Sequence, residues 1–398
     1  MSTRFTVLGA GVGLSFVAAS LSLAACASDE EAGSLVPDAT ETAIPQSEAG
    51  ALDAVDGADG GAPCTTDDCA FFPDACGPDV LCLNGLFDPV DPSAEPSWRT
   101  RVTAIGGRSP ADVWLVGTLG TAAHFDGTSW KQADVGTGES LSFLWLTSTG
   151  EVAFGTPDRL YSRGLNAGDA GVSPDGWSTR GPIAPPAGYP NSAVTATWAM
   201  PGSNLLWLAT PSSVWRLETD GSTFAARPGL SSSVCSTTPC RRLRSFHGSS
   251  AGTVWAVGDE GAAIRITGAD GATPVVEVTN PLTWKRLNGV WSVSDTEAWA
   301  VGVDGMILHN TGAGLSWDGV SSLPANEHLN AITGTSSSDI WAVGDAGVVL
   351  HYGGTAWSRV KIAGLGSRRP DLYTVWSAGP GQVWIGGQGV LLALGDKR

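Results

Sequence analysis

The sequence predicts an all-β protein, a seven-bladed β-propeller of four-stranded blades that is closed by a strand from the N-terminal side. Two observations carry this prediction. A phrase built on Trp-Ala-Val-Gly recurs along the chain, and its copies lie about 42 to 48 residues apart. Repeats of this length indicate an array whose units bury their cores only against one another. The tryptophans of the phrase are Trp114, Trp207, Trp255, Trp299, Trp341 and Trp384.

A seventh unit lies between Trp114 and Trp207, whose separation is twice the usual repeat. The segment 152–161 fits there without a gap, and Val152 takes the place of the tryptophan. Its Thr156-Pro157 recurs as Thr210-Pro211 in the next unit, which supports the alignment. The array therefore has seven units.

The sixth unit displays the expected strands most clearly. Its apolar, β-branched and aromatic runs cover 329–335, 340–344, 348–352 and 357–362, and Gly, Ser and Asp separate them. Short runs bounded by such turn residues predict strands and hairpins. Four short strands per unit, repeated radially, describe a β-propeller.

The two ends of the array indicate how the ring closes. The last unit has three runs, at 372–377, 382–386 and 390–394, and no fourth. The first unit is preceded by Trp98-Arg99-Thr100-Arg101, which resembles the segments beginning at Trp284 and Trp357. We therefore expect the strand at 98–101 to complete the last blade, and residues 98–398 to form the propeller. An open solenoid would need capping units instead.

Residues 1–25 have the pattern of an export signal, with Arg4 ahead of a long apolar stretch. The stretch ends in Leu23-Ala24-Ala25-Cys26, which resembles the lipobox of bacterial lipoproteins. This resemblance implies cleavage before Cys26, acylation of its thiol and amine, and firm membrane anchoring by the acyl chains. Ala27 in place of Asp is similar to the outer-membrane default, so we expect an envelope location, periplasmic or surface-exposed. An ordinary signal or a spanning helix with an incidental cysteine is the alternative.

The negative charge of the chain lies ahead of the propeller. The formal net charge is −17, yet residues 27–97 hold 16 Asp and Glu and no Lys or Arg. From Trp98 onward, 21 Lys and Arg face 23 Asp and Glu. We expect residues 26–63 to be a lipidated, disordered tether, because a stretch rich in Gly, Ala and Asp cannot bury a core. The balanced charge of the ring gives no support to nucleic-acid binding.

Six cysteines are left once Cys26 is assigned to lipid, and an even number in an exported chain indicates disulfides. Cys235 and Cys240 bracket one short loop. A cluster of four defines a disulfide-rich segment at 64–97, with three possible pairings among Cys64, Cys69, Cys76 and Cys82. A zinc site is the alternative for the cluster, but the spacing lacks paired Cys-x2-Cys motifs. We expect no metal and no cofactor.

Three histidines occupy one repeated position, at His124, His309 and His351. Blade symmetry would place them at equal radius on different blades, which predicts a structural role rather than a shared metal site. The acids of Gly258-Asp259-Glu260-Gly261 and Gly344-Asp345-Ala346-Gly347 fall in hairpin turns, where Asp and Gly suit the backbone. A calcium site is the alternative, although the chain has no Asp-x-Asp-x-Asp-Gly loop.

The segments Asp126-Gly127-Thr128-Ser129-Trp130 and Gly353-Gly354-Thr355-Ala356-Trp357 resemble the turn of Asp-box (BNR) repeats. Together with the Trp-Ala-Val-Gly phrase, they make residues 98–398 similar to BNR/YVTN-like, WD40-like and photosystem-assembly-factor-like propellers of bacterial lipoproteins. This resemblance implies the blades, not an activity. Sialidases also carry BNR repeats, but no tyrosine here matches their nucleophile, and the sequence has no His-Glu-x-x-His motif. We assign no catalytic residue.

We therefore expect a monomeric, membrane-anchored propeller that acts as a binding or assembly scaffold for an unknown protein or anionic glycan. One alternative is a propeller-type glycoside hydrolase or lyase that acts on polysaccharide. Another is a purely structural surface protein. A central pocket lined by two close carboxylates would favour the enzyme.

Two links between expected blades carry arginines. Residues 231–240 lead into Arg241, Arg242 and Arg244, and residues 363–370 contain Arg368 and Arg369. Links from an outer strand to the next inner strand share one face of a propeller, so these arginines predict a basic binding rim for anionic partners. The alternative is that they solvate loops or pair with nearby acids.

Overall fold

The computed structural model describes residues 67–88, 91, 93, 95–166, 171–320 and 326–395 of the chain. The expected signal at 1–25, Cys26, the tether at 26–63 and Cys64 lie outside the described residues. Among the residues that are described, no helix has the length and apolar character needed to cross a bilayer.

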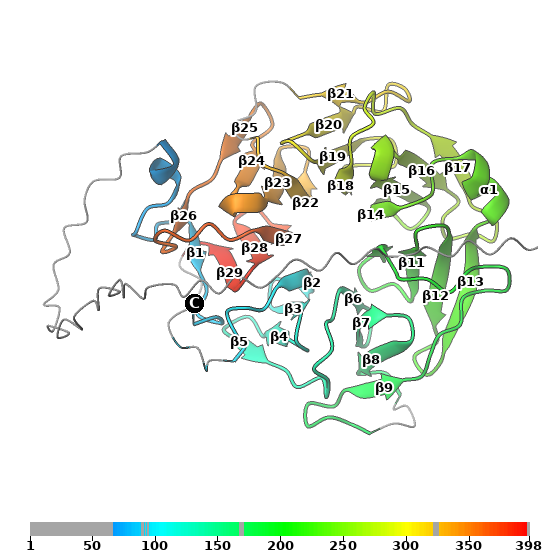
Figure 1. Cartoon of the computed structure of the whole chain (residues 1–398), viewed down its shortest axis with the longest axis horizontal. Coiled ribbons are helices and arrows are strands. Elements are labelled where there is room, and N and C mark those ends of the chain that lie inside the picture. The colour runs from blue at the N-terminus through cyan, green and yellow to red at the C-terminus, as the bar shows by residue number, and fades with distance from the viewer. Residues whose placement is uncertain are drawn as a thin grey trace, which may run out of the picture. The chain divides into compact units, whose positions relative to one another are not determined.

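Seven sheets follow one another along the chain and form the blades of a propeller, as the sequence predicts (Figure 1). Within each of the first six blades, consecutive strands pair antiparallel, and the strand order in the sheet equals the order in sequence. The first blade contains β2 (Val102–Ser109), β3 (Asp112–Gly117), β4 (Ala122–Phe125) and β5 (Trp130–Gln132); the second contains β6 (Phe143–Leu146), β7 (Glu151–Thr156), β8 (Arg159–Arg163) and β9 (Ser178–Arg180); the third contains β10 (Ala196–Trp198), β11 (Leu205–Ala209), β12 (Val214–Thr219) and β13 (Phe224–Leu230).

The next three blades repeat this arrangement. The fourth contains β14 (Leu243–Ser250), β15 (Thr253–Gly258), β16 (Ala263–Thr267) and β17 (Val275–Val278); the fifth contains β18 (Leu287–Ser292), β19 (Ala298–Gly302), β20 (Ile307–Asn310) and β21 (Asp318–Gly319); the sixth contains β22 (Leu329–Ser336), β23 (Asp339–Gly344), β24 (Val349–Tyr352) and β25 (Trp357–Arg359). Short helices occupy turns and links: α1 (Ser232–Thr237) and the 3-10 turns η1 (Asp67–Phe71), η2 (Asp259–Gly261) and η3 (Asp345–Gly347).

The seventh blade closes the ring with a strand from the N-terminal side. It contains β27 (Leu372–Gly379), β28 (Gln382–Gly387) and β29 (Val390–Leu394), followed by β1 (Leu81–Leu83) and β26 (Ile362–Ala363). β1 pairs antiparallel with β29 and parallel with β26. Closure by an N-terminal strand is confirmed, but that strand comes from the segment at 64–97.

The expectation that residues 98–101 form the closing strand is wrong. Arg101 makes a single bridge to Gln388, and the Trp98 carbonyl lies so close to Gly389 that a Cβ there would approach it to 1.8 Å. Residues 98–101 therefore cross the turn between β28 and β29 as a link to β2. The edge of β29 is already occupied by β1.

The repeated tryptophans lie in the second strand of each blade, and Val152 holds that place in β7. These strands are buried on both faces because each sheet is packed between two neighbours. Trp255 of β15, for example, packs with Leu287 and Val290 of the next blade. Trp255 is 1% exposed, so its replacement by Ala would cost about 3–5 kcal/mol of folding free energy. The core is thus a series of layers between blades.

Hydrogen bonds between first strands add to this packing. Four polar side chains at or next to the start of a first strand each donate a hydrogen bond to a backbone carbonyl. The carbonyl lies at or shortly before the start of the first strand of the next blade. The pairs are Thr103 to Leu141, Thr195 to Leu243, Asn288 to Leu329 and Asn330 to Leu372, at 2.6 to 3.0 Å. These bonds hold the first strands at fixed spacing around the centre of the ring.

Candidate functional site

The first strands of all seven blades line a central cavity of about 510 Å³. Each first strand contributes between four and five consecutive residues, such as Thr103–Gly107 from β2 and Asn330–Gly334 from β22. The cavity thus runs along the first strands, at the place where propellers and other closed β-architectures accept ligands.

One layer of the cavity is set by strand register. It consists of the first-strand residues that pair with the repeated second-strand position, and four of the seven are tryptophans. Trp198 pairs with Trp207, Trp291 with Trp299, and Trp376 with Trp384. The other members of the layer are Trp145, His247, Thr333 and Gly106. Sequence reasoning missed this layer.

Three of these tryptophans pack against a glycine in the next blade. A Cβ added to Gly248 would lie 2.6 Å from the ring of Trp198, and one added to Gly107 would lie 2.6 Å from the ring of Trp376. Gly334 approaches the ring of Trp291 in the same way, at 2.8 Å. Only glycine allows this approach of ring to backbone. Trp198 and Trp376 stay partly exposed, so their free ring surfaces face the cavity.

His247 occupies the same layer between Trp198 and Trp291, with ring centroids 6.0 and 6.2 Å away. The backbone N–H of Ser292 donates to its Nδ1 at 3.1 Å, which places the proton of the neutral ring on Nε2. Burial lowers the pKa of His247 to about 4, so the ring is neutral near pH 7. His247 is thus a fixed, uncharged hydrogen-bond donor in the lining of the cavity.

The remaining polar lining comes from amides, hydroxyls and one arginine. Asn288 and Asn330 line the cavity, and Asn330 also donates to Asp345 at 2.7 Å. Arg244 forms an ion pair with Asp259 in the turn after β15. No Asp or Glu belongs to the lining among the residues that the structure describes.

The three repeated histidines do not line this cavity. The Nε2–H of each histidine donates to the carboxylate that begins or directly precedes the second strand of its own blade, and each ring stacks on the tryptophan of that blade. The pairs are His124–Asp112 at 2.8 Å, His309–Glu297 at 2.9 Å and His351–Asp339 at 2.9 Å. The ring centroids lie 3.8 to 4.4 Å from Trp114, Trp299 and Trp341. This geometry agrees with a structural role.

Asp339 is the best satisfied of these acids. Burial raises its pKa, but hydrogen bonds from Thr335, His351 and Trp341 outweigh that effect and hold the pKa below its usual range. The Trp341 Nε1–H donates to the same oxygen as the histidine, at 2.8 Å. Asp339 therefore stays ionised and fixes both aromatic rings.

Arginine takes the place of histidine in the third and fourth blades. Arg216 pairs in register with Trp207 and lies 5.4 Å from its ring, and Arg265 lies 5.5 Å from the ring of Trp255. Arg216 is 6% exposed and donates to the carbonyl of Gly271 at 2.7 Å. The third-strand position that pairs with the repeated tryptophan is thus occupied by histidine or arginine in five blades. Within the residues described, no His, Cys, Asp and Glu gather in a group that could hold a metal.

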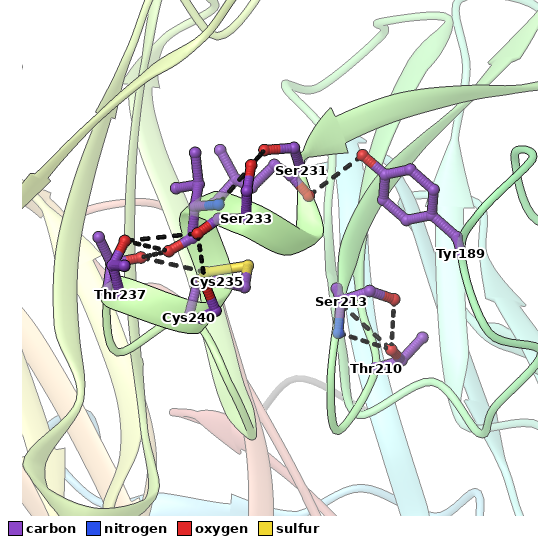
Figure 2. The surroundings of a disulfide bond; sticks show 12 residues. Tyr189, Thr210, Ser213, Ser231, Ser233, Cys235, Thr237 and Cys240 are labelled. Atoms are coloured by element: carbon purple, nitrogen blue, oxygen red, sulfur yellow. Dashed lines mark hydrogen bonds between the residues drawn. A yellow bond between two sulfur atoms is a disulfide. The ribbon is translucent and has the colours of Figure 1, made fainter.

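The cysteines that the structure describes are in disulfides. Cys235 bonds to Cys240, and Cys76 bonds to Cys82 of the closing strand β1. Cys69 is also disulfide-bonded. Figure 2 shows the first of these bridges, which joins Cys235 of α1 to Cys240; the N-terminal cap of α1 is the side chain of Ser231. The bridge closes a loop within the link, and burial of both cysteines in one cluster with Leu230 and Leu243 packs the link against the ring.

The arginines of the expected basic rim divide into two groups. Arg368 is half-buried and bonds to the carbonyls of Gln388 and Gly389, and Arg369 lies 3.6 Å from the ring centroid of Phe72. Arg244 is paired with Asp259. Arg241 and Arg242 are exposed to solvent.

No protein-family model matches the sequence. No curated protein matches it either. Solved structures do share the fold. YCF48 bound to a D1 peptide is 17% identical, over 81% of this chain and 98% of that chain, with a TM-score of 0.55. YCF48 from Cyanidioschyzon merolae is 18% identical, over 74% and 95%, with a TM-score of 0.55.

A catalytically inactive histidine-to-alanine variant of virginiamycin B lyase from Staphylococcus aureus, solved with quinupristin, is 13% identical. That match covers 78% of this chain and 98% of that chain, with a TM-score of 0.56. At such identities the likeness concerns the fold alone. The chain is a seven-bladed β-propeller similar in fold to YCF48 and to virginiamycin B lyase.

Proposed function

We propose that the protein is a binding scaffold anchored in the cell envelope, and that it takes a segment of its partner at the central cavity. The observation that carries the proposal is the lining of that cavity. Partly exposed rings of Trp198 and Trp376 and the neutral donor His247 line the cavity, and the amides of Asn288 and Asn330 add further polar groups.

This lining suits recognition of an uncharged or weakly charged segment. Tryptophan offers a large rigid apolar surface, and tryptophans dominate the energy of many interfaces. The lining groups are held before binding, because Trp198 packs on Gly248 and Ser292 fixes the ring of His247. A site organised in advance loses less entropy on binding. A propeller of the same fold, YCF48, has been solved with a D1 peptide, which supports a peptide as the kind of ligand.

A binding role is favoured over glycoside hydrolysis by the same lining. Hydrolysis of a glycosidic bond ordinarily uses two carboxyl groups that flank the bond. The cavity has no Asp or Glu in its lining within the described part of the chain, and its ionisable lining residues are Arg244 and His247.

The envelope location is proposed from the sequence at Cys26 and from the disulfides. Bridges such as Cys76–Cys82 persist in oxidising compartments and are rare in the cytosol. If Cys26 carries the anchor, Cys26→Ser yields an uncleaved or soluble protein on cell fractionation. A Cys26→Ser protein that is still processed and still extracted from membranes by detergent would contradict lipid anchoring.

Site-directed photo-crosslinking in intact cells tests the binding site. A photoreactive phenylalanine analogue replaces Thr333, which lines the cavity, and in a control chain it replaces Val275, which is 63% exposed on β17. We expect a discrete crosslinked partner from position 333 and none from position 275. Crosslinks from position 275 alone, or the same set from both positions, would contradict a central binding site.

A further inference from the structure

The link between the fourth and fifth blades exposes two large apolar side chains. Trp284 is 81% exposed and Leu282 is 70% exposed, the two highest values among the large hydrophobic residues that the structure describes. Trp98, on the link ahead of β2, is only partly exposed, and the other tryptophans of this ring pack between blades or line the cavity. Tryptophan is enriched at interfaces, where one side of the indole is apolar and its N–H remains in a polar environment.

Trp284 lies on the same rim as Arg241 and Arg242. The turn Gly258–Gly261 joins β15 to β16, and the backbone N–H of Asp259 in that turn donates to the carbonyl of Arg242 at 3.2 Å. On its other side, a Cβ added to Gly261 would lie 1.9 Å from the Thr283 carbonyl and 3.3 Å from the Trp284 Cα. Arg242 and Trp284 thus flank one four-residue turn.

The charged side chains around this turn carry a net positive charge when those that form ion pairs within the protein are left out of the count. Asp259 is paired with Arg244, and Asp304 is paired with Lys285 at 2.9 Å. Glu260 is the exposed acid of the turn. Against it stand Arg241, Arg242 and Arg286, all exposed, and the structure records no side-chain hydrogen bond or ion pair for these three within the described residues. We call Arg241, Arg242, Leu282, Trp284 and Arg286 the Trp284 rim.

The link that carries the two arginines is held in place. It contains α1, capped by Ser231, and the buried Cys235–Cys240 bridge immediately before Arg241 (Figure 2). The Arg242 backbone adopts φ of 54°, a conformation that a free loop would rarely select. The arginines are therefore presented from a fixed scaffold.

We propose that the Trp284 rim contacts an anionic membrane surface, with Trp284 and Leu282 inserted at the level of the headgroups. Indole side chains prefer the boundary between hydrocarbon and water, and arginines near an anionic bilayer are attracted to its negative surface potential. A protein partner is disfavoured by size. Two exposed apolar side chains fall well short of the ~800 Å² that each partner of a stable interface buries.

The site is distinct from the central cavity, because Arg241, Arg242, Leu282, Trp284 and Arg286 do not belong to the cavity lining. It also revises the expected basic rim. Arg368 and Arg369, on the link between the sixth and seventh blades, are engaged within the protein, whereas Arg241 and Arg242 lie beside exposed apolar side chains. The proposal does not depend on the nature of the ligand in the cavity.

Quenching of tryptophan fluorescence by brominated acyl chains tests this contact in the full chain. Vesicles contain phosphatidylcholine alone, or phosphatidylcholine and phosphatidylglycerol at about 7:3, each with bromine on the acyl chains. This readout reports whether Trp284 reaches the bilayer, even where the N-terminal segment holds the chain on the vesicle. We expect quenching on the anionic vesicles, and at least a twofold loss of the quenched fraction on neutral ones.

Two variants distinguish the indole of Trp284, which reports contact with the bilayer, from the arginines that attract the anionic lipid. Trp284→Phe removes the indole but keeps an apolar ring, so it should abolish the quenching and leave vesicle association unchanged. Arg241→Ser with Arg242→Ser keeps the indole and should lower the quenched fraction at least twofold on anionic vesicles. Arg368→Ser with Arg369→Ser is the matched control and should leave that fraction unchanged.

Three outcomes would overturn the proposal. They are no quenching on anionic vesicles, equal quenching in wild type and Trp284→Phe, and equal loss from the two double-arginine variants. A photo-crosslinker at position 284 that captures one discrete protein in cells, in a chain whose Trp284 is not quenched by lipid, would assign the rim to a protein partner.

Discussion

Replacing Leu81 by Ala removes the central apolar contact of the strand that closes the ring. Leu81 is fully buried in a cluster with Ile362, Val390 and Leu392, and its backbone N–H donates to the Lys361 carbonyl at 2.9 Å. A buried Leu→Ala change costs about 2–5 kcal/mol, including the cavity that is left. With about 2.1 cal/mol/K of unfolding entropy per residue, a ring of roughly 330 residues would melt about 4 °C lower for a loss of about 3 kcal/mol.

Thermal melting and urea unfolding of the full chain measure this loss. Trp98→Ala is the matched control, because Trp98 is half-exposed and belongs to a link rather than to a strand. We expect a loss of less than about 1 kcal/mol for that variant, as for most surface substitutions. A larger loss from Trp98→Ala than from Leu81→Ala would refute closure by β1 and restore the segment 98–101 as the closing strand.

Two further predictions concern the lining of the cavity. Because burial lowers the pKa of His247 to about 4, below the ordinary value of about 6.5, the unfolded chain binds more protons between these pH values. Wild type should therefore lose stability as the pH falls through that window. In urea titrations at pH 7 and 4.5, His247→Asn should lose less stability than wild type between the two pH values. The same loss in both chains would contradict the role of His247. Gly248→Ala brings a Cβ to 2.6 Å from the ring of Trp198 and should cost about 1–3 kcal/mol in thermal melts. Gly252→Ala is the control and should cost less stability, because the nearest atom to its added Cβ lies 3.9 Å away. Equal losses of stability in the two variants would contradict the packing of the Trp198 ring on Gly248.

The blades could be predicted from the sequence because their signal is local and repeated. Val152 was placed correctly in a second strand without a tryptophan, since neighbouring motifs fixed its alignment. The closing strand could not be found in this way. Leu81–Leu83 is three residues long, and its pairing with β29 depends on where the chain returns in space. The resemblance between the segments at Trp98 and Trp284 has a structural cause, because both segments are links that cross a turn of a blade.

The sequence does contain a signal for the layer of first-strand residues that lines the cavity. Trp291 and Trp376 each precede the second-strand tryptophan by eight residues, and His247 precedes Trp255 by the same interval. Alignment on the second strand alone hides this first-strand position. The engagement of Arg368 by the carbonyls of Gln388 and Gly389 was beyond sequence reasoning, because backbone acceptors leave no trace in residue identity.

The affinity for the partner captured at position 333 tests the central claim most directly. Thr333→Trp places a fifth tryptophan in the cavity layer and fills the cavity, while Val275→Trp adds the same side chain on the exposed outer strand. Circular dichroism first establishes that both variants keep the fold. We predict a dissociation constant at least tenfold weaker for Thr333→Trp and unchanged for Val275→Trp. An unchanged constant for a folded Thr333→Trp chain would contradict recognition at the central cavity.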